Sequence, residues 1–140
     1  MKNSQVRIAA PMGSARRLRE TATEPIRKIL APVDFSEHSD EAARVAAEFA
    51  KKTGASLDLL HAIDSAPEYA AYLPPEALEI ERKMREIGTE RLDAVARSLA
   101  ATNVNVELHL VQGAPAQTIS DEAQRLGSDL IVMGTHGRTG

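Results

Sequence analysis

The chain has 140 residues, enough for one domain with a single core, and its 43% hydrophobic and 26% charged residues are ordinary for a globular protein. Its formal net charge of -3 argues against a general nucleic-acid binder, which needs a basic surface. The absence of cysteine excludes disulfides, thiolate metal sites and a cysteine nucleophile, and no stretch approaches the roughly 18 apolar residues of a membrane span. We therefore expect a cytoplasmic protein with no nucleic-acid or membrane partner.

The first 25 residues differ from the rest of the chain. They carry five basic residues against two acidic ones, and Pro11, Gly13 and Pro25 interrupt any regular pattern. An organelle transit peptide is one interpretation of such an arginine-rich start, and a poorly ordered basic tail is the simpler one. We predict a disordered basic extension over residues 1–25 and a domain over residues 26–140.

Four apolar segments alternate with three amphipathic ones in the rest of the chain. The predicted strands cover residues 29–33, 56–64, 104–113 and 129–134. The first predicted helix lies between the capping residue Ser36 and Gly54, and the last lies between Pro115 and Gly127. A long helix over residues 76–101 separates the second and third strands, and we expect one apolar face on it from Ile80, Met84, Ile87, Val95 and Leu99.

The order βαβαβαβ predicts an α/β fold: an open, Rossmann-like parallel sheet with helices on both faces. The first and fourth strands are continuous apolar runs, typical of central strands, whereas the third alternates as an edge strand does. A strand order of 3-2-1-4 satisfies both patterns. It places a topological switch point, where α/β sheets bind ligands, between the ends of strands one and four, at Asp34 and Gly134.

The segment "GTHGRTG" (residues 134–140) follows the fourth strand. Glycines admit positive φ and let backbone N–H groups approach phosphate oxygens, and Arg138 can add charge-assisted hydrogen bonds. The spacing is neither the Walker pattern nor the dinucleotide fingerprint. Phosphate binding and a flexible turn both remain open for this segment.

Asp34 is the second candidate. A carboxylate at the end of the first strand could accept hydrogen bonds from ribose hydroxyls or hold a divalent cation through water, but it could equally be a turn residue that bonds nearby amides. The four histidines, at positions 38, 61, 109 and 136, show no metal-binding spacing. We assign no catalytic residue and no metal ligand from the sequence.

Several stretches resemble the universal stress protein family, in its order and spacing, from about Ile26 to the end of the chain. They are "PVDFSEHS", "LLHAID", "GAPAQTI" and "DLIVMGTHGRTG". The resemblance implies ATP, with or without Mg²⁺, as the cofactor. It also implies that Pro32, Val33 and Asp34 flank the nucleoside, that Ala62 and Ile63 lie against the adenine, and that Met133, Gly134, Gly137 and Arg138 line the ribose and phosphates.

ATP-binding members of the family carry a glycine, two residues, a glycine, nine residues, and then a glycine followed by Ser or Thr. Gly134 and Gly137 match the opening of this pattern, and the third glycine would fall beyond Gly140. We therefore expect a domain truncated at its C-terminus, with the fifth strand missing and the fourth strand left as an uncovered apolar edge. The resemblance implies a homodimer for the full-length protein.

The function expected from these observations is stress-related binding of ATP or AMP, with a sensor or regulatory role and at most slow hydrolysis. The alternative is a family member that retains no nucleotide and acts through dimerisation and protein partners. An enzyme of related fold is disfavoured, because no activated nucleophile or base is identifiable in the sequence.

Overall fold

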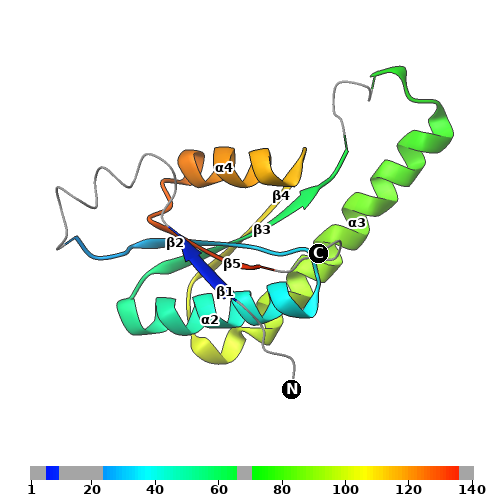
Figure 1. The fold of residues 1–140 in the computed structure, drawn as a ribbon. Helices are drawn as coiled ribbons and strands as arrows, with labels where there is room; N and C mark the ends of the chain where they lie inside the picture. Colours follow the sequence, from blue (N-terminus) through cyan, green and yellow to red (C-terminus); the bar gives the residue numbers. More distant parts are fainter. Residues whose placement is uncertain (1–5, 10–23, 66–70, 136–140) are drawn as a thin grey trace.

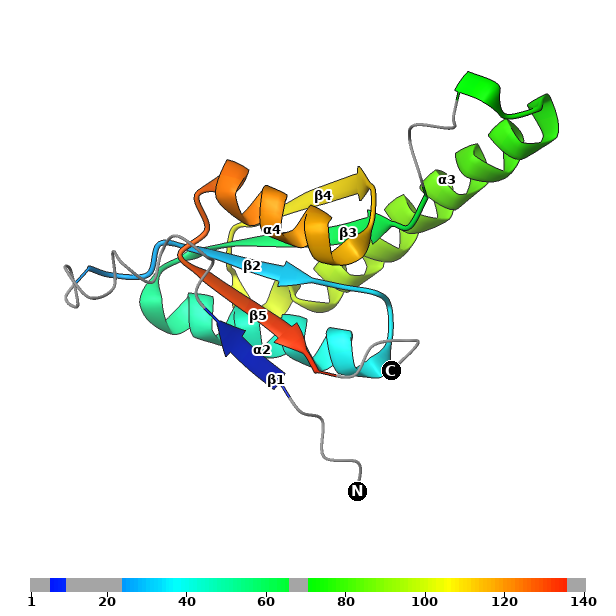
Figure 2. The same cartoon turned by 45° about the horizontal axis from the view of Figure 1, so that its top comes forward.

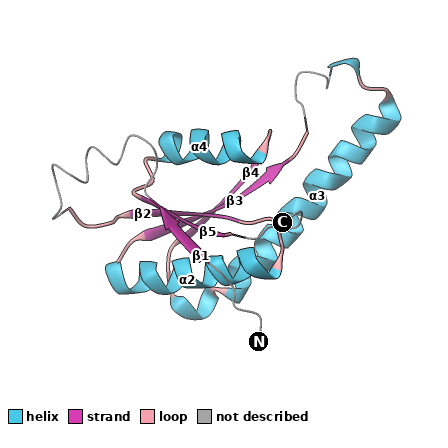
Figure 3. Ribbon diagram, viewed as in Figure 1, coloured by secondary structure: helices cyan, strands magenta, loops and turns pink. Residues whose placement is uncertain are grey.

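The computed structural model describes residues 6–9, 24–65 and 71–135 (Figure 1). Within them lie five strands: β1 (Val6–Ala9), β2 (Lys28–Pro32), β3 (Ser56–Ile63), β4 (Val106–Gln112) and β5 (Leu130–Gly134). The helices are α2 (Glu37–Thr53), α3 (Pro75–Ser98) and α4 (Pro115–Leu126), and a 3-10 turn (Ala100–Thr102) follows α3. The α/β class and the alternation of strands with helices are as the sequence predicts (Figure 3).

The sheet has the order β1-β5-β2-β3-β4 (Figure 2). The four strands β2 to β5 are parallel and confirm the predicted 3-2-1-4 order, with the alternating strand β4 at one edge. The other edge differs from the prediction. The strand β1 pairs antiparallel with β5, with Val6 opposite Gly134 and Ala9 opposite Ile131, so β5 is an inner strand of the sheet.

The pairing of β1 corrects two expectations. Val6–Ala9 is not part of a disordered tail, and the edge of β5 is not uncovered, because this strand satisfies its backbone groups. The reason is that an isolated stretch of four residues carries almost no pattern of its own, whereas an apolar edge strand offers it a complete hydrogen-bond ladder.

Helices cover both faces of the sheet (Figure 1). The larger core lies on the side of α2 and α3, where a row of α2 alanines packs on strand residues such as Ile29, Leu57 and Val132. The smaller core lies under α4, where Ala123 meets Leu30 and Ile131. No helix in the described part of the chain is both long and apolar enough to cross a membrane.

Helix α2 begins and ends as the sequence predicts. The Ser36 hydroxyl accepts a hydrogen bond from the Ser39 amide, and Gly54 ends the helix in the left-handed region at φ 76°. Helix α3 differs from its prediction, because its first half projects beyond the sheet (Figure 2). Ile80, Met84 and Ile87 are therefore exposed, and only Gly88 and Leu92 of this helix are buried.

Candidate functional site

A cavity of about 310 Å³ lies at the carboxyl ends of β2, β3 and β5, at the predicted switch point. Its wall residues come from five places in the sequence: the end of β2, the first turn of α2, the end of β3, the first half of α4 and the end of β5. They are Pro32, Val33, Asp34, Ser39, Leu60, His61, Ala62, Pro115, Ile119, Met133, Gly134 and Thr135. The lining is mostly apolar, with a few polar groups, which is the usual composition of a small-molecule site.

The turn after β2 forms one wall. The Asp34 carboxylate accepts a hydrogen bond from the Ser36 amide (3.0 Å), and the Asp34 amide donates to the Ser39 hydroxyl (3.1 Å). Phe35 has φ 64°, a left-handed conformation that costs a non-glycine residue about 1–2 kcal/mol. Asp34 is therefore both a turn residue and a lining residue, so the two interpretations of this carboxylate are compatible.

The end of β3 supports this strained turn. Nδ1 of His61 lies 2.8 Å from the carbonyl oxygen of Val33, so Nδ1 carries a proton and donates it. The His61 ring packs against Phe35 with 4.3 Å between ring centroids, and the Arg91 guanidinium lies 5.2 Å above the Phe35 ring. These contacts hold the Phe35 side chain on the outer side of the turn.

The end of β5 forms the opposite wall. A Cβ added to Gly134 would lie 3.0 Å from the backbone carbon and oxygen of His38, in the first turn of α2. A side chain here would press against helix backbone, so the close passage of the strand favours glycine. This close approach brings the end of β5, with Met133 and Thr135, to the first turn of α2.

The charge at this helix N-terminus is carried by carboxylates. Burial raises the pKa of Asp40, the neighbouring Asp34 carboxylate raises it further, and Arg91 opposes both effects. Asp34 is the one carboxylate among the cavity residues. It is thus the residue there that could hold a cation such as Mg²⁺, through water.

A larger and more open depression of about 620 Å³ lies between α2 and α3. Three carboxylates face it, those of Glu37, Asp40 and Glu41, against the two guanidinium groups of Arg44 and Arg91. The Arg44 guanidinium is already engaged with Glu41. An anionic ligand would be repelled there, so the cavity at the switch point is the better candidate site.

Six of the nine residues predicted from the sequence line the cavity: Pro32, Val33, Asp34, Ala62, Met133 and Gly134. Ile63 does not line it, because its side chain is buried and its carbonyl accepts hydrogen bonds from Ser65 and Gly113. Gly137 and Arg138 lie outside the described residues.

The sequence analysis did not assign Ser39, Leu60, His61, Pro115, Ile119 or Thr135 to the site. Strand alternation could have indicated Leu60, which lies two residues before Ala62 on the same face of β3. Ser39 and Ile119 carry no such signal, since only the packing of their helices on the sheet brings them to the cavity.

Known proteins of the same kind match most of the chain. The model of the universal stress protein family matches residues 25–140. Universal stress protein MJ0531 of Methanocaldococcus jannaschii is 34% identical over 116 residues, covering 81% of this chain and 67% of that protein. A universal stress protein of Thermus aquaticus is 38% identical over 109 residues, covering 78% of this chain and 77% of that protein.

Solved structures agree. The structure of protein MJ0577 of M. jannaschii superimposes with a TM-score of 0.72 at 28% identity, covering 84% of this chain and 80% of that one. Three more distant structures are complexes: a universal stress protein with cAMP, one from Archaeoglobus fulgidus with dAMP, and one from Arabidopsis thaliana with AMP. The cAMP complex is 20% identical with a TM-score of 0.55, the dAMP complex 22% with 0.52, and the AMP complex 23% with 0.57. The matches cover 74–80% of this chain and 70–78% of the chains in those structures. The fold, the matched residues and the relatives above 30% identity together show that the chain belongs to the universal stress protein family.

Proposed function

We propose that this chain binds an adenine nucleotide, ATP or AMP, in the cavity at the carboxyl ends of β2, β3 and β5. Through this binding it acts as a sensor or regulator in the response to stress. The observation that carries the proposal is that one cavity is lined by six of the residues that the family resemblance implies for the nucleotide site. The complexes of distant family members with cAMP, dAMP and AMP support the same class of ligand.

The chemistry of the lining fits the parts of a nucleotide. The side chains of Leu60, Ala62, Ile119 and Met133 offer an apolar surface to adenine, and the Asp34 carboxylate can accept hydrogen bonds from ribose hydroxyls. Thr135, at the end of β5, adds a hydroxyl that can hydrogen-bond to the ribose or a phosphate.

The cavity holds no evident catalytic machinery among its described residues. The hydroxyl of Ser39 donates to the Ser36 carbonyl (3.1 Å) and accepts from the Asp34 amide, so its proton is used by the turn. The Nδ1 proton of His61 is held by the Val33 carbonyl, and among the described residues no hydroxyl is paired with its second ring nitrogen as a nucleophile. Binding with at most slow hydrolysis is therefore the activity that this lining supports.

Calorimetric titration of the chain with AMP, ATP, ATP plus Mg²⁺ and GTP tests the proposal. We expect saturable binding of the adenine nucleotides and weaker binding of GTP. Replacing Ala62 by Phe fills the cavity and should weaken AMP binding at least tenfold, whereas the control Ala94→Phe, on the exposed surface of α3, should not. Absence of binding up to millimolar nucleotide, or equal affinity in both variants, would refute the proposal.

One observation favours a second function, action through dimerisation or protein partners. The first half of α3 exposes Leu78, Ile80, Met84 and Ile87, each between 45% and 59% accessible. Exposed apolar side chains at helical spacing are typical of an interaction surface. The two functions are separable, because Ile80→Glu together with Ile87→Glu should abolish self-association in sedimentation and leave nucleotide affinity unchanged.

A further inference from the structure

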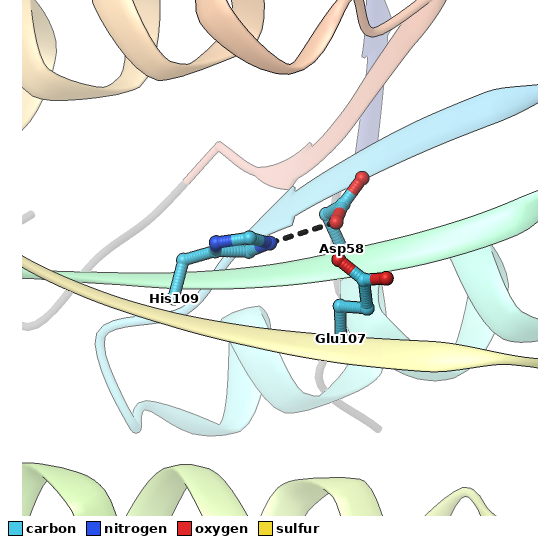
Figure 4. Close-up of side chains that lie close together, drawn as sticks. All are labelled: Asp58, Glu107 and His109. Atoms are coloured by element: carbon cyan, nitrogen blue, oxygen red, sulfur yellow. Dashed lines mark hydrogen bonds and ion pairs between the residues drawn. The ribbon is translucent and has the colours of Figure 1, made fainter.

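Three potential metal ligands meet on the α4 side of the sheet, away from the nucleotide cavity. Asp58 on β3 lies opposite Glu107 in the β3–β4 register, and His109 lies two residues further along β4 on the same face (Figure 4). One ligand atom from each side chain lies within 4.8 Å of the other two. No local sequence pattern indicates this cluster, because its members come from two strands and Asp58 and Glu107 are 49 residues apart.

Asp58 is an unusual residue to find in this position. Its side chain is only 3% exposed, and its Oδ1 accepts a hydrogen bond from Nε2 of His109 at 2.7 Å. Its second oxygen, Oδ2, is buried, and no hydrogen-bond donor reaches it from the described residues. A buried carboxylate oxygen without a partner is costly, so the site is incomplete as it stands.

The Arg125 guanidinium does not compensate for the charge of Asp58. Arg125 on α4 interacts electrostatically with Asp58, but its guanidinium is bound to both oxygens of Glu122, with contacts of 2.6 to 3.0 Å. Glu122 in turn faces His109. Three carboxylates, those of Asp58, Glu107 and Glu122, therefore lie in one region. Against them the described contacts set the Arg125 guanidinium and the His109 imidazole.

We propose that Asp58, Glu107 and His109 form a binding site for a divalent transition-metal ion, with Zn²⁺ as the best match to two carboxylate oxygens and one imidazole nitrogen. The metal takes the place of the Nε2 proton of His109: from a neutral ring this proton shifts to Nδ1, and from an imidazolium it is released to solvent while Nδ1 keeps its own. The buried Asp58 oxygens then gain the positive charge that they lack.

The geometry allows such an ion with small movements. Bonds of about 2.0–2.2 Å place the ligand atoms of a tetrahedral Zn²⁺ site roughly 3.3 Å apart. The Asp58–His109 pair is slightly closer than this and must open, while the exposed Glu107 side chain can swing inward from the surface. The exposed side of the cluster leaves the fourth position to water, and the metal would tie β4 to β3.

The test is a titration of the metal-free chain with Zn²⁺, followed by calorimetry, and with Co²⁺, followed by its visible absorption. We expect one high-affinity ion per chain and the intense Co²⁺ bands of a four-coordinate site with a nitrogen ligand. Glu107→Gln and His109→Gln should each weaken Zn²⁺ binding at least about tenfold, since even the loss of a group that only orients a ligand costs about 10–100-fold. Glu90→Gln, an exposed carboxamide substitution on α3, is the matched control and should bind as the parent chain does.

Glu107 is exposed, so its variant should fold, and its melting temperature without metal should equal that of the control. Zn²⁺ should raise the melting temperature of the parent and control chains and not that of Glu107→Gln. If Zn²⁺ does not bind, or if all three variants bind it equally, Asp58 and His109 form only a structural pair and the proposal is wrong. Nucleotide binding is independent of this result, because none of the three residues lines the nucleotide cavity.

Discussion

Replacement of Gly134 by alanine tests whether the contact between β5 and α2 shapes the cavity proposed to bind nucleotide. The added Cβ would lie 3.0 Å from the His38 carbonyl carbon and oxygen and 3.2 Å from the His38 Cβ. These neighbours are helix backbone, which cannot rotate away as a flexible side chain can. The end of β5 must therefore shift away from the N-terminus of α2.

The magnitude follows from two opposing effects. Overpacking of this kind lowers the free energy of unfolding by about 1–3 kcal/mol. Replacing glycine also restricts the unfolded chain, which raises the free energy of unfolding by about 0.4–1 kcal/mol where the conformation suits alanine. We expect a net destabilisation of about 1–2 kcal/mol. Gly127→Ala is a matched control, because its φ of 67° costs alanine about 1–2 kcal/mol although no atom lies within 4 Å of the added Cβ.

Urea denaturation and AMP titration of both variants separate strain from the loss of site geometry. Both variants should lose similar stability, but only Gly134→Ala should lose AMP affinity, by about tenfold or more, because only this substitution moves the cavity wall. If Gly134→Ala is as stable as the parent chain, β5 does not pass as close to α2 as the 3.0 Å contacts indicate. If it is destabilised but binds AMP normally, this contact does not shape the site.

Three further predictions follow from the described contacts. Asp34→Ala should weaken AMP binding by about 1–3 kcal/mol in calorimetry, whereas the control Asp93→Ala, on the exposed face of α3, should not. Equal affinities of the two variants would mean that Asp34 is only a turn residue. Hydrogen bonding to Arg125 lowers the pKa of Glu122. The ionised carboxylate therefore stabilises the fold at pH values above its ordinary pKa of 4.5, and this stabilisation is lost as the pH falls through the lowered pKa of the folded state. Glu122→Gln should accordingly melt below the parent chain at pH 7, with the gap closing in acid; a gap of constant size would contradict the ion pair. Deletion of residues 1–9 should lower the melting temperature and cause aggregation visible by light scattering, since it removes β1 from the edge of β5; an unchanged, monodisperse protein would show that β1 is dispensable.

Local patterns predicted the parts of this molecule whose determinants lie close together in the sequence. The serine at position 36 caps α2 and Gly54 ends it, because capping depends on groups within one turn of the helix. The continuous apolar strands lie inside the sheet and the alternating strand at its edge, because each pattern reports how many faces of a strand are covered. The same patterns located the switch point between Asp34 and Gly134, and the resemblance to the family supplied the other cavity residues that were predicted.

Periodicity alone misled where it could not show what an element packs against. Ile80, Met84 and Ile87 have the spacing of a buried helix face, yet they are exposed, since α3 is longer than the sheet it crosses. Spacing defines which side chains share a face of a helix, but the position of the helix on the sheet decides whether that face meets anything.

The sequence by itself determined the class of fold, the order of the parallel strands and the place of the cavity at the switch point, because these follow from hydrophobic periodicity, caps and the handedness of crossovers. Only the tertiary structure decided that Val6–Ala9 completes the sheet beside β5, that Gly134 touches the backbone of α2, and that Asp58, Glu107 and His109 share one site. Each of these depends on the register or approach of segments far apart in the chain. Such a register is set by the packing of the whole core, which no local stretch of residues encodes.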